Sequence, residues 1–285
     1  MIKVIASDLD GTLLGNDGRI APQTLEALHR ACDAGIRFII TTGRNFRGAM
    51  KALKGMELTC DYLVSSGAEV RDCRKEIVSC VAMDIDLCRE IYSVLKNYPV
   101  SSIFATDDYD YQIGTYEEIE ERTLLHLKSN FMNMSMEEIK NSELFGKRMG
   151  TTKIVRDFQE LEEADVPIYK IFLFSNDREM LERIEKNLAD FSSIAVSSSF
   201  STNLEITDIR AQKGPVLKKY IESLGYRMEE VMVFGDSRND CSMLAMDFGA
   251  TVAMGNADLE TKKTAKYVTK SNVDLGVAYV IDQLL

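Results

Sequence analysis

The residues best suited to chemistry in this 285-residue chain begin with a pair of aspartates near its start. Asp8 and Asp10 lie within Asp8-Leu9-Asp10-Gly11-Thr12, directly after a short apolar run. Side chains alternate along an extended segment, so these two carboxylates share a face. Mg²⁺ is typically held by one or two carboxylates together with waters and phosphate oxygens. The pair therefore indicates a metal or catalytic site, although an acidic turn after a strand is the simpler interpretation. In the functional interpretation, Gly11 permits a sharp turn and Thr12 offers a hydroxyl to a phosphate oxygen.

Two further segments could contact a phosphate. Thr42-Gly43-Arg44 follows the next apolar run, where the Thr42 hydroxyl and a helix N-terminus can both donate to an anion. Arg44 could reach a substrate or could equally be a solvated surface residue. Lys213 precedes a predicted helix; if it lies near Asp8 it would neutralise carboxylate and phosphate as a compact point charge. Sequence spacing cannot establish that proximity, and a solvated lysine is the alternative.

The fourth segment is Gly235-Asp236-Ser237-Arg238-Asn239-Asp240, which follows another apolar run. Asp236 can supply a further metal oxygen, and Asn239 and Asp240 can support the ligands through hydrogen bonds. An Asp-rich turn that caps the next helix is the alternative, and we expect capping in either case.

The elements around these segments alternate between strands and helices. Pro22 suits a first helical turn, and Gly35 ends that helix. The alternation predicts βαβ units, and so an α/β fold with a Rossmann-like, doubly wound parallel sheet. Open sheets of this kind bind ligands at the carboxyl ends of their strands, which is where the acidic segments fall. The predicted strands are 2–6, 36–40, 62–64, 231–234 and 251–254, and the later helices are 215–224, 242–248 and 275–284.

The middle of the chain has a different pattern. Residues 84–207 show strands of alternating character and charged helices, which indicates an antiparallel sheet with helices on one face. We therefore predict an inserted α+β cap domain at 84–207 and a core domain formed by 1–83 and 208–285. The predicted strands are 102–105, 168–174, 194–198 and 203–206, with a helix at 177–188.

Composition excludes several classes of partner. The net charge of −11 disfavours nucleic acid and anionic membrane surfaces, which both need a basic surface. No apolar stretch approaches the roughly 18 residues of a membrane span, and the N-terminus has no signal-peptide pattern. The six cysteines form no C-x-x-C pair, which is typical of reduced thiols in a cytoplasmic protein. No obligate protein partner is evident.

Taken together, these motifs resemble the haloacid dehalogenase-like superfamily, in particular its Cof-type phosphatases with a large inserted cap. The resemblance rests on Val4–Leu14, the threonine and lysine motifs, Val233–Asp236, Asn239-Asp240 and Ala253–Ala257. Two departures are visible: Ser66 stands in Ser65-Ser66-Gly67-Ala68 where the family usually has Asn-Gly-Ala, and Arg238 is uncommon in the last acidic loop.

The resemblance implies a mechanism. Asp8 would attack phosphorus and form an aspartyl phosphate, while Asp10 would act as general acid and then general base. Mg²⁺ would be held by the Asp8 carboxylate, the Asp10 backbone carbonyl and Asp236, with Asp240 behind them. Phosphate would contact Lys213 and residues of the neighbouring loops, namely Leu9, Thr42, Gly43, Arg44 and Asn239.

The implied substrate is a small phosphorylated metabolite, such as a sugar phosphate or a phosphorylated cofactor, and the cap would close over it. Two alternatives remain open at this point. A sugar phosphomutase would share Asp8 and Asp10 but return the phosphoryl group to sugar. A non-catalytic protein that binds phosphorylated metabolites would keep the fold without turnover.

Overall fold

The computed structural model describes residues 1–130 and 133–285, which form two compact units. Met1–Val81 and Ile209–Leu285 make up one unit, called the core domain below. Ala82–Asp208 make up the other, called the inserted domain. The predicted insertion, 84–207, begins two residues later and ends one residue earlier than this unit.

An eight-stranded sheet forms the centre of the core domain. Two neighbouring inner strands, β1 and β12, are parallel and carry the first and last acidic segments at their carboxyl ends. All five residues of β1 are buried, as expected for a parallel strand covered on both faces. Strands β14 to β3 are parallel, whereas β4 and β5 form an antiparallel extension that was not predicted. The order is β14 (Tyr267–Val268), β13 (Ala250–Ala253), β12 (Val231–Gly235), β1 (Val4–Asp8), β2 (Arg37–Thr41), β3 (Asp61–Val64), β4 (Glu69–Arg71) and β5 (Ile77–Cys80).

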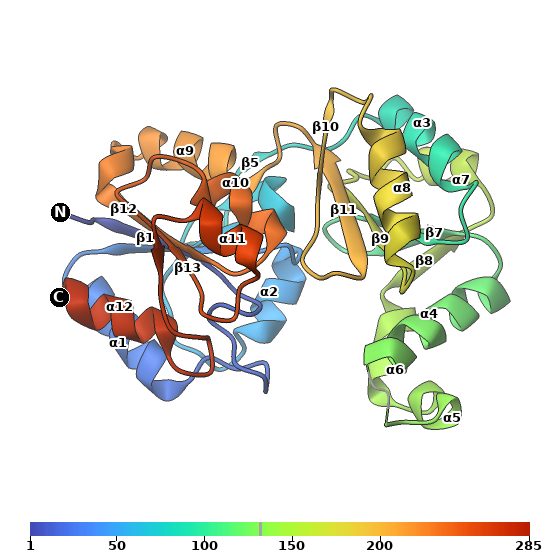
Figure 1. Ribbon diagram of the computed structural model, residues 1–285. Helices are drawn as coiled ribbons and strands as arrows, with labels where there is room; N and C mark the ends of the chain where they lie inside the picture. Colours follow the sequence, from blue (N-terminus) through green and yellow to red (C-terminus); the bar gives the residue numbers. More distant parts are fainter. Residues whose placement is uncertain (131–132) are drawn as a thin grey trace. The chain divides into compact units, whose positions relative to one another are not determined.

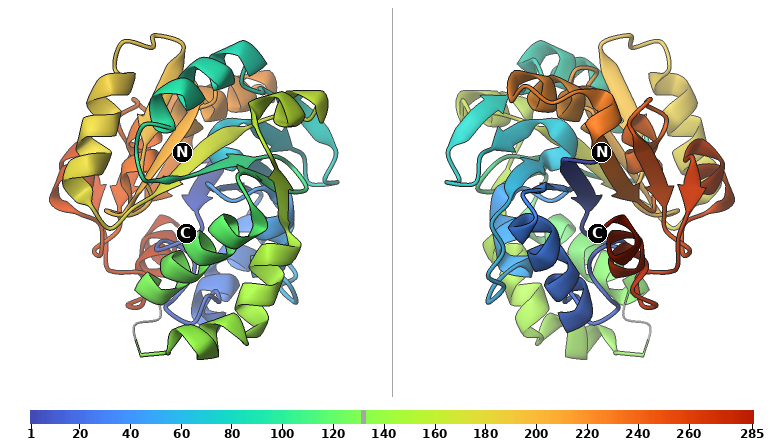
Figure 2. Two further views of the ribbon diagram at one scale, coloured as in Figure 1. Left: turned by 90° about the vertical axis from the view of Figure 1, so that its right-hand side faces the viewer. Right: turned by 90° about the vertical axis from the view of Figure 1, so that its left-hand side faces the viewer.

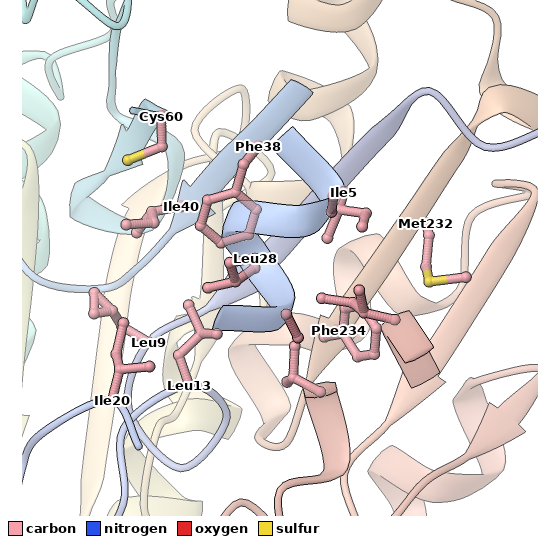
Figure 3. Packing of buried hydrophobic residues seen from close by; sticks show 14 of the residues in the cluster. Ile5, Leu9, Leu13, Ile20, Leu28, Phe38, Ile40, Cys60, Met232 and Phe234 are labelled. Atoms are coloured by element: carbon pink, nitrogen blue, oxygen red, sulfur yellow. The ribbon is translucent and has the colours of Figure 1, made fainter. Parts of the chain in front are cut away.

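Helices cover both faces of this sheet (Figures 1 and 2). Helices α1 (Pro22–Asp33) and α12 (Gly276–Leu284) lie side by side on one face, where α2 (Phe46–Ala52) also packs. Figure 3 shows the apolar side chains between them and the sheet, including Ile5, Phe38 and Phe234. Helices α9 (Lys213–Ser223) and α10 (Cys241–Leu244) pack on the other face. Because Ile5 faces one cluster and Val4 the other, β1 contributes to both cores.

The inserted domain contains a six-stranded sheet with a helical layer on one face. Helices α3 (Ile85–Leu95), α7 (Phe158–Glu163) and α8 (Arg178–Leu188) enclose a core that includes Phe104 and Leu173. The strand order is β10 (Ile194–Ser197), β11 (Asn203–Asp208), β9 (Lys170–Phe174), β6 (Ser101–Ala105), β7 (Asp110–Ile113) and β8 (Thr152–Val155).

The expectation of an antiparallel sheet with helices on one face needs two corrections. First, β7 and β8 pair in parallel. Second, α4 (Tyr116–Asn130) contacts the other face, because His126 stacks on Phe174 of β9 with ring centroids 4.0 Å apart. Ile171 and Leu173, which alternate with Phe174 along β9, point into the opposite core. Helix α4 also packs with α5 (Met136–Lys140) and α6 (Glu143–Gly150), coloured green in Figure 2.

In the part of the chain that the structure describes, no helix has both the length and the apolar character needed to cross a membrane.

Candidate active site

Lys213 connects two acidic segments of the core domain. Its side chain is fully buried at the start of α9, and Nζ donates to Oδ1 of Asp8 and Oδ1 of Asp240, each at 2.7 Å. Nζ also lies 3.4 Å from Oδ1 of Asn239. Asp8 is the last residue of β1, and Asn239 and Asp240 follow β12. The proximity of Lys213 and Asp8 that spacing alone could not establish is therefore present.

Gly214 lets α9 deliver Lys213 to this position. A Cβ atom at residue 214 would lie 2.8 Å from the backbone nitrogen of Met243 and closer still to the Ser242 carbonyl. Only glycine permits this approach of α9 to α10, and the Gly214 N–H donates to the Ser242 hydroxyl at 3.2 Å. The Lys213-Gly214 pair thus combines a charged group with the close packing that buries it.

Asp236 is held by the loop that follows β1. The Thr12 hydroxyl donates to Asp236 Oδ1 at 2.8 Å, a contact that we did not predict. Gly11 has φ +78°, and a Cβ atom there would come within 2.8 Å of Asp236 Cγ. Gly11 therefore supplies both the left-handed turn and the space that Asp236 occupies.

Asp240 supports the loop that carries Asp236. Its Oδ2 accepts from the backbone N–H groups of Asp236 and Ser237 at 3.0 and 3.1 Å, while Oδ1 faces Lys213. The same side chain completes a capping box with Ser237, as the capping alternative anticipated. Asn239 accepts from the Ser237 hydroxyl at 2.9 Å. Asp240 thus caps the following helical turn and also supports the loop that carries Asp236.

The charges of this cluster fit a divalent cation. Asp8, Asp236 and Asp240 each place one carboxylate oxygen within 4.8 Å of the others. Burial, followed by repulsion from Asp240, raises the pKa of Asp236 to about 7. Burial would lower the pKa of Lys213, but Asp240 and Asp8 outweigh it and raise that pKa. When all three carboxylates are ionised, one lysine leaves two negative charges uncompensated, and an all-oxygen donor set of this charge suits Mg²⁺.

Asp10 and Arg44 form a separate ion pair beside this cluster. Arg44 Nε donates to Asp10 Oδ2 at 2.7 Å, and Nη2 donates to Oδ1 at 2.6 Å. The Asp10 side chain is therefore not among the clustered carboxylates, and any metal contact of Asp10 would come from its backbone carbonyl. The Arg44 side chain is therefore paired with Asp10 while it remains partly exposed.

Two asparagines that we did not predict as site residues fix the loop after β1. Asn256 Nδ2 donates to the Gly11 carbonyl at 2.8 Å, and Asn272 Nδ2 donates to the Leu14 carbonyl at 2.7 Å. The Asn272 backbone N–H donates in turn to Asn256 Oδ1 at 3.0 Å. Asn256 lies within the Gly255-Asn256-Ala257 segment that carried part of the resemblance, whereas Asn272 had no signal in the sequence.

The other predicted phosphate-binding positions lie in loops at the same edge of the sheet. Thr42 is buried after β2, and its hydroxyl accepts from the Arg44 backbone N–H at 3.2 Å. Gly43 lies between them, and Leu9 follows Asp8 with its side chain in the apolar cluster of Figure 3. Ser66 has φ +61°, a conformation that asparagine, the usual family residue, adopts more readily than serine.

Comparison with known proteins decides the family. The sequence model for haloacid dehalogenase-like hydrolases matches residues 5–281, which is nearly the whole chain. The chain belongs to the haloacid dehalogenase-like hydrolases. The resemblance and the α/β fold predicted from the sequence are thereby confirmed.

Individual relatives of this hydrolase cover the full chain. The 5-amino-6-(5-phospho-D-ribitylamino)uracil phosphatase YwtE of Bacillus subtilis (strain 168) is 31% identical over 289 residues, covering 100% of this chain and 98% of the relative. The pyridoxal phosphate phosphatase YbhA of Escherichia coli (strain K12) is 28% identical, covering 98% and 97%. A solved haloacid dehalogenase-like hydrolase from B. subtilis superposes with a TM-score of 0.85 at 29% identity, over 100% of both chains. Family membership and these relatives identify the enzyme as a phosphatase.

Proposed function

We propose that this hydrolase is a Mg²⁺-dependent phosphatase that hydrolyses a small phosphorylated metabolite through an aspartyl phosphate on Asp8. The buried contact of Asp8 with Lys213, inside a cluster of three carboxylates, is the observation that carries the proposal. It supplies a nucleophile, a fixed positive charge and a set of oxygen donors at one point.

Asp8 acts as the nucleophile in this proposal. Lys213 contacts Oδ1 of Asp8, which leaves Oδ2 as the oxygen that attacks phosphorus. The P–O bond to the leaving group breaks as the bond to Oδ2 forms, and water then displaces the phosphoryl group from Asp8. Covalent catalysis of this kind divides one difficult displacement into two easier ones.

The remaining residues orient and neutralise the phosphoryl group. Lys213, the Thr42 hydroxyl, Asn239 and the backbone N–H groups around Leu9 and Gly43 would bind its oxygens, which is where phosphoryl transfer gains most of its rate. Mg²⁺, held by the Asp8 and Asp236 carboxylates and the Asp10 carbonyl, would supply positive charge that offsets the phosphate. Asp10 would give a proton to the leaving oxygen and later take one from water.

Two kinds of observation support a small substrate. The two relatives named above act, by their names, on a phosphorylated ribitylamino-uracil and on pyridoxal phosphate. The net charge of −11 disfavours a nucleic acid or an anionic membrane surface as partner. We therefore propose a sugar phosphate or a phosphorylated cofactor as substrate, a cytoplasmic setting, and a role for the inserted domain in substrate choice.

Asp8→Asn tests the proposed function, since it removes the nucleophile while nearly preserving shape. We expect hydrolysis of 4-nitrophenyl phosphate by the unchanged protein with Mg²⁺, its loss in EDTA, and at least about a thousand-fold lower kcat in the variant. Asp33→Asn, at an exposed position at the end of α1, is the matched control and should keep full activity. Normal turnover by Asp8→Asn would overturn the role of Asp8. Transfer of phosphate to a sugar without free phosphate would indicate a mutase.

A further inference from the structure

The contact between Arg44 and Asp10 has a geometry that fixes the orientation of a carboxyl group. Two parallel N–H groups of one guanidinium meet the two oxygens of one carboxylate at 2.7 and 2.6 Å. A fork of this kind restrains both the position and the plane of the carboxylate, whereas a lysine would restrain its position alone. Each carboxylate oxygen keeps a further lone pair outside the fork, so the group can still carry or accept a proton.

Arg44 is itself held by the loops that follow β2 and β3. Its backbone N–H donates to the Thr42 hydroxyl at 3.2 Å, and its carbonyl accepts from the Ser65 N–H at 2.7 Å. Ser65 has φ +51°, a conformation that residues other than glycine seldom adopt, so the chain accepts local strain at the residue that makes this bond.

The Arg44–Asp10 ion pair contributes little to the stability of the fold. The Arg44 and Asp10 side chains are 37% and 40% exposed, and ion pairs at such positions stabilise a fold by about 0–1 kcal/mol. The pair nevertheless lies next to the acidic cluster: the hydrogen bond to Asp10 is the main cause of a raised Arg44 pKa, and Asp8 contributes to it as well. Arg44 therefore stays charged beside the nucleophile while its donors are directed at Asp10.

We propose that Arg44 is a positioning residue, which holds the Asp10 carboxyl group in the orientation for proton transfer and does not serve as a phosphate ligand. The inference rests on the proposed function, in which Asp10 exchanges protons with substrate. As the P–O bond breaks, its electron pair stays on the leaving oxygen and the Asp10 O–H proton moves to that oxygen. When water attacks the aspartyl phosphate, it releases a proton to the Asp10 carboxylate, which restores the starting state.

The test compares two substrates with different leaving groups at saturating Mg²⁺. Phenolate is a poorer leaving group than 4-nitrophenolate and depends more on the proton from Asp10. We expect Arg44→Met to lower kcat on phenyl phosphate at least about tenfold more than on 4-nitrophenyl phosphate, within the range of general acid catalysis. The KM values and the inhibition constant of inorganic phosphate should change less than about threefold. Arg44→Lys, which keeps the charge without the fork, should not restore the rate on phenyl phosphate.

Two further comparisons separate positioning from phosphate binding. If Arg44 acts through Asp10, then Asp10→Ala and the double variant Asp10→Ala/Arg44→Met should have the same kcat. Arg74→Met, at an exposed position of the core domain, is the matched control and should leave both substrates unaffected. Circular dichroism and the thermal midpoint of each variant show whether it folds, and Arg44→Lys provides a second variant should Arg44→Met fail.

Three outcomes would overturn the proposal: a rise of the phosphate inhibition constant above about tenfold, an equal loss on both substrates, or additive effects in the double variant. Any of them would show that Arg44 does not act by positioning Asp10, and the first would make Arg44 a phosphate ligand, while the proposed phosphatase function would stay intact. Failure of the unchanged protein to hydrolyse either phosphate would instead overturn the proposed function, and the assignment of Arg44 with it.

Discussion

At the scale of single residues, the electrostatics of the site depend on how Lys213 shares its charge. Its ammonium group contacts Asp8 and Asp240 at the same distance of 2.7 Å, so the two carboxylates share one positive charge. Asp236 has instead a hydroxyl donor, Thr12. Burial and the nearby carboxylates raise the pKa of Asp236 to about 7, so a bound cation should displace the proton that this carboxyl group holds below that pH.

Gly11→Ala tests the space reserved for Asp236. The added Cβ would overlap that carboxylate and would also occupy a φ of +78°. We expect Mg²⁺ affinity, measured from the Mg²⁺ dependence of hydrolysis, to fall about 10–100-fold, as for other residues that support metal ligands. Gly55→Ala is the matched control, since Gly55 has φ +84° and nothing within 4 Å of a Cβ. Both variants should lose about 1–2 kcal/mol of stability from the φ strain. Equal Mg²⁺ affinity in the two variants would show that the clash is unimportant.

The raised pKa of Asp236 predicts how stability depends on pH without metal. The folded protein keeps the Asp236 proton up to about pH 7, whereas the unfolded chain loses it near the ordinary value of 3.8. The folded state therefore binds more protons over this range, and its stability should fall as pH rises from about 4 to 7. Thermal unfolding in EDTA at several pH values should show this fall, and Asp236→Asn should reduce it. An unchanged pH slope in Asp236→Asn would contradict the raised pKa.

At the scale of elements, the site depends on close approaches between backbones. Helix α9 packs on α10 only because residue 214 has no side chain, and Asp240 packs against Gly235 at the end of β12 in a similar way. Within the inserted domain, α4 is fixed to β9 by the stacking of His126 on Phe174. Charged helices such as α4 have a weak apolar stripe, so a few aromatic contacts of this kind decide where they dock.

The position of α4 can be tested through the titration of His126. Burial, with a further contribution from the positive charge of Arg148, lowers its pKa to about 4. An unfolded histidine binds a proton near pH 6.5, so stability should be lost as pH falls from about 6.5 towards 4. His126→Phe keeps a ring on Phe174 and should reduce that loss.

NMR provides the direct measurement, because the chain has only two histidines. The signal that disappears in His126→Phe should titrate near pH 4. A midpoint near 6.5 would show that α4 does not bury this ring against β9.

At the scale of the whole molecule, the two units have separate apolar cores. The cluster around Phe104 and Leu173 is formed within residues 83–206, and the clusters around Phe234 and Leu217 within the core domain. We therefore expect a fragment of residues 82–208 to fold alone and to unfold cooperatively in urea, monitored by circular dichroism. A fragment with helical signal but no cooperative transition would show that the inserted domain needs the core domain.

The parallel part of the core domain could be predicted from the sequence because buried parallel strands are near-continuous apolar runs. β1, β2 and β12 are of this type and lie within a residue or two of their predicted limits. β5 was missed because all four of its residues are exposed, and α4 because charged residues dominate it. Neither segment has the periodicity on which such predictions depend.

In the candidate site, too, some features could be predicted from the sequence and others could not. The acidic groups and Lys213 could be predicted, since their residue types follow strands or begin helices at one edge of the sheet. The hydrogen-bond partners of Thr12 and Arg44 could not be predicted. Which of several nearby acceptors a side chain contacts depends on distances that exist only in the folded protein. The contact of Thr12 with Asp236 was not predicted, and the partner of Arg44, which the sequence left open, is Asp10.

Trapping the phosphoryl group on the protein shows whether Asp8 carries it. A ³²P-labelled phosphomonoester, mixed with excess enzyme and Mg²⁺ and quenched in acid within one turnover, should leave label on the peptide that contains Asp8. The label should be released by hydroxylamine, as expected of an acyl phosphate, and should be absent in Asp8→Asn. Label on any other residue, or an equal amount on Asp8→Asn, would contradict a mechanism in which Asp8 carries the phosphoryl group.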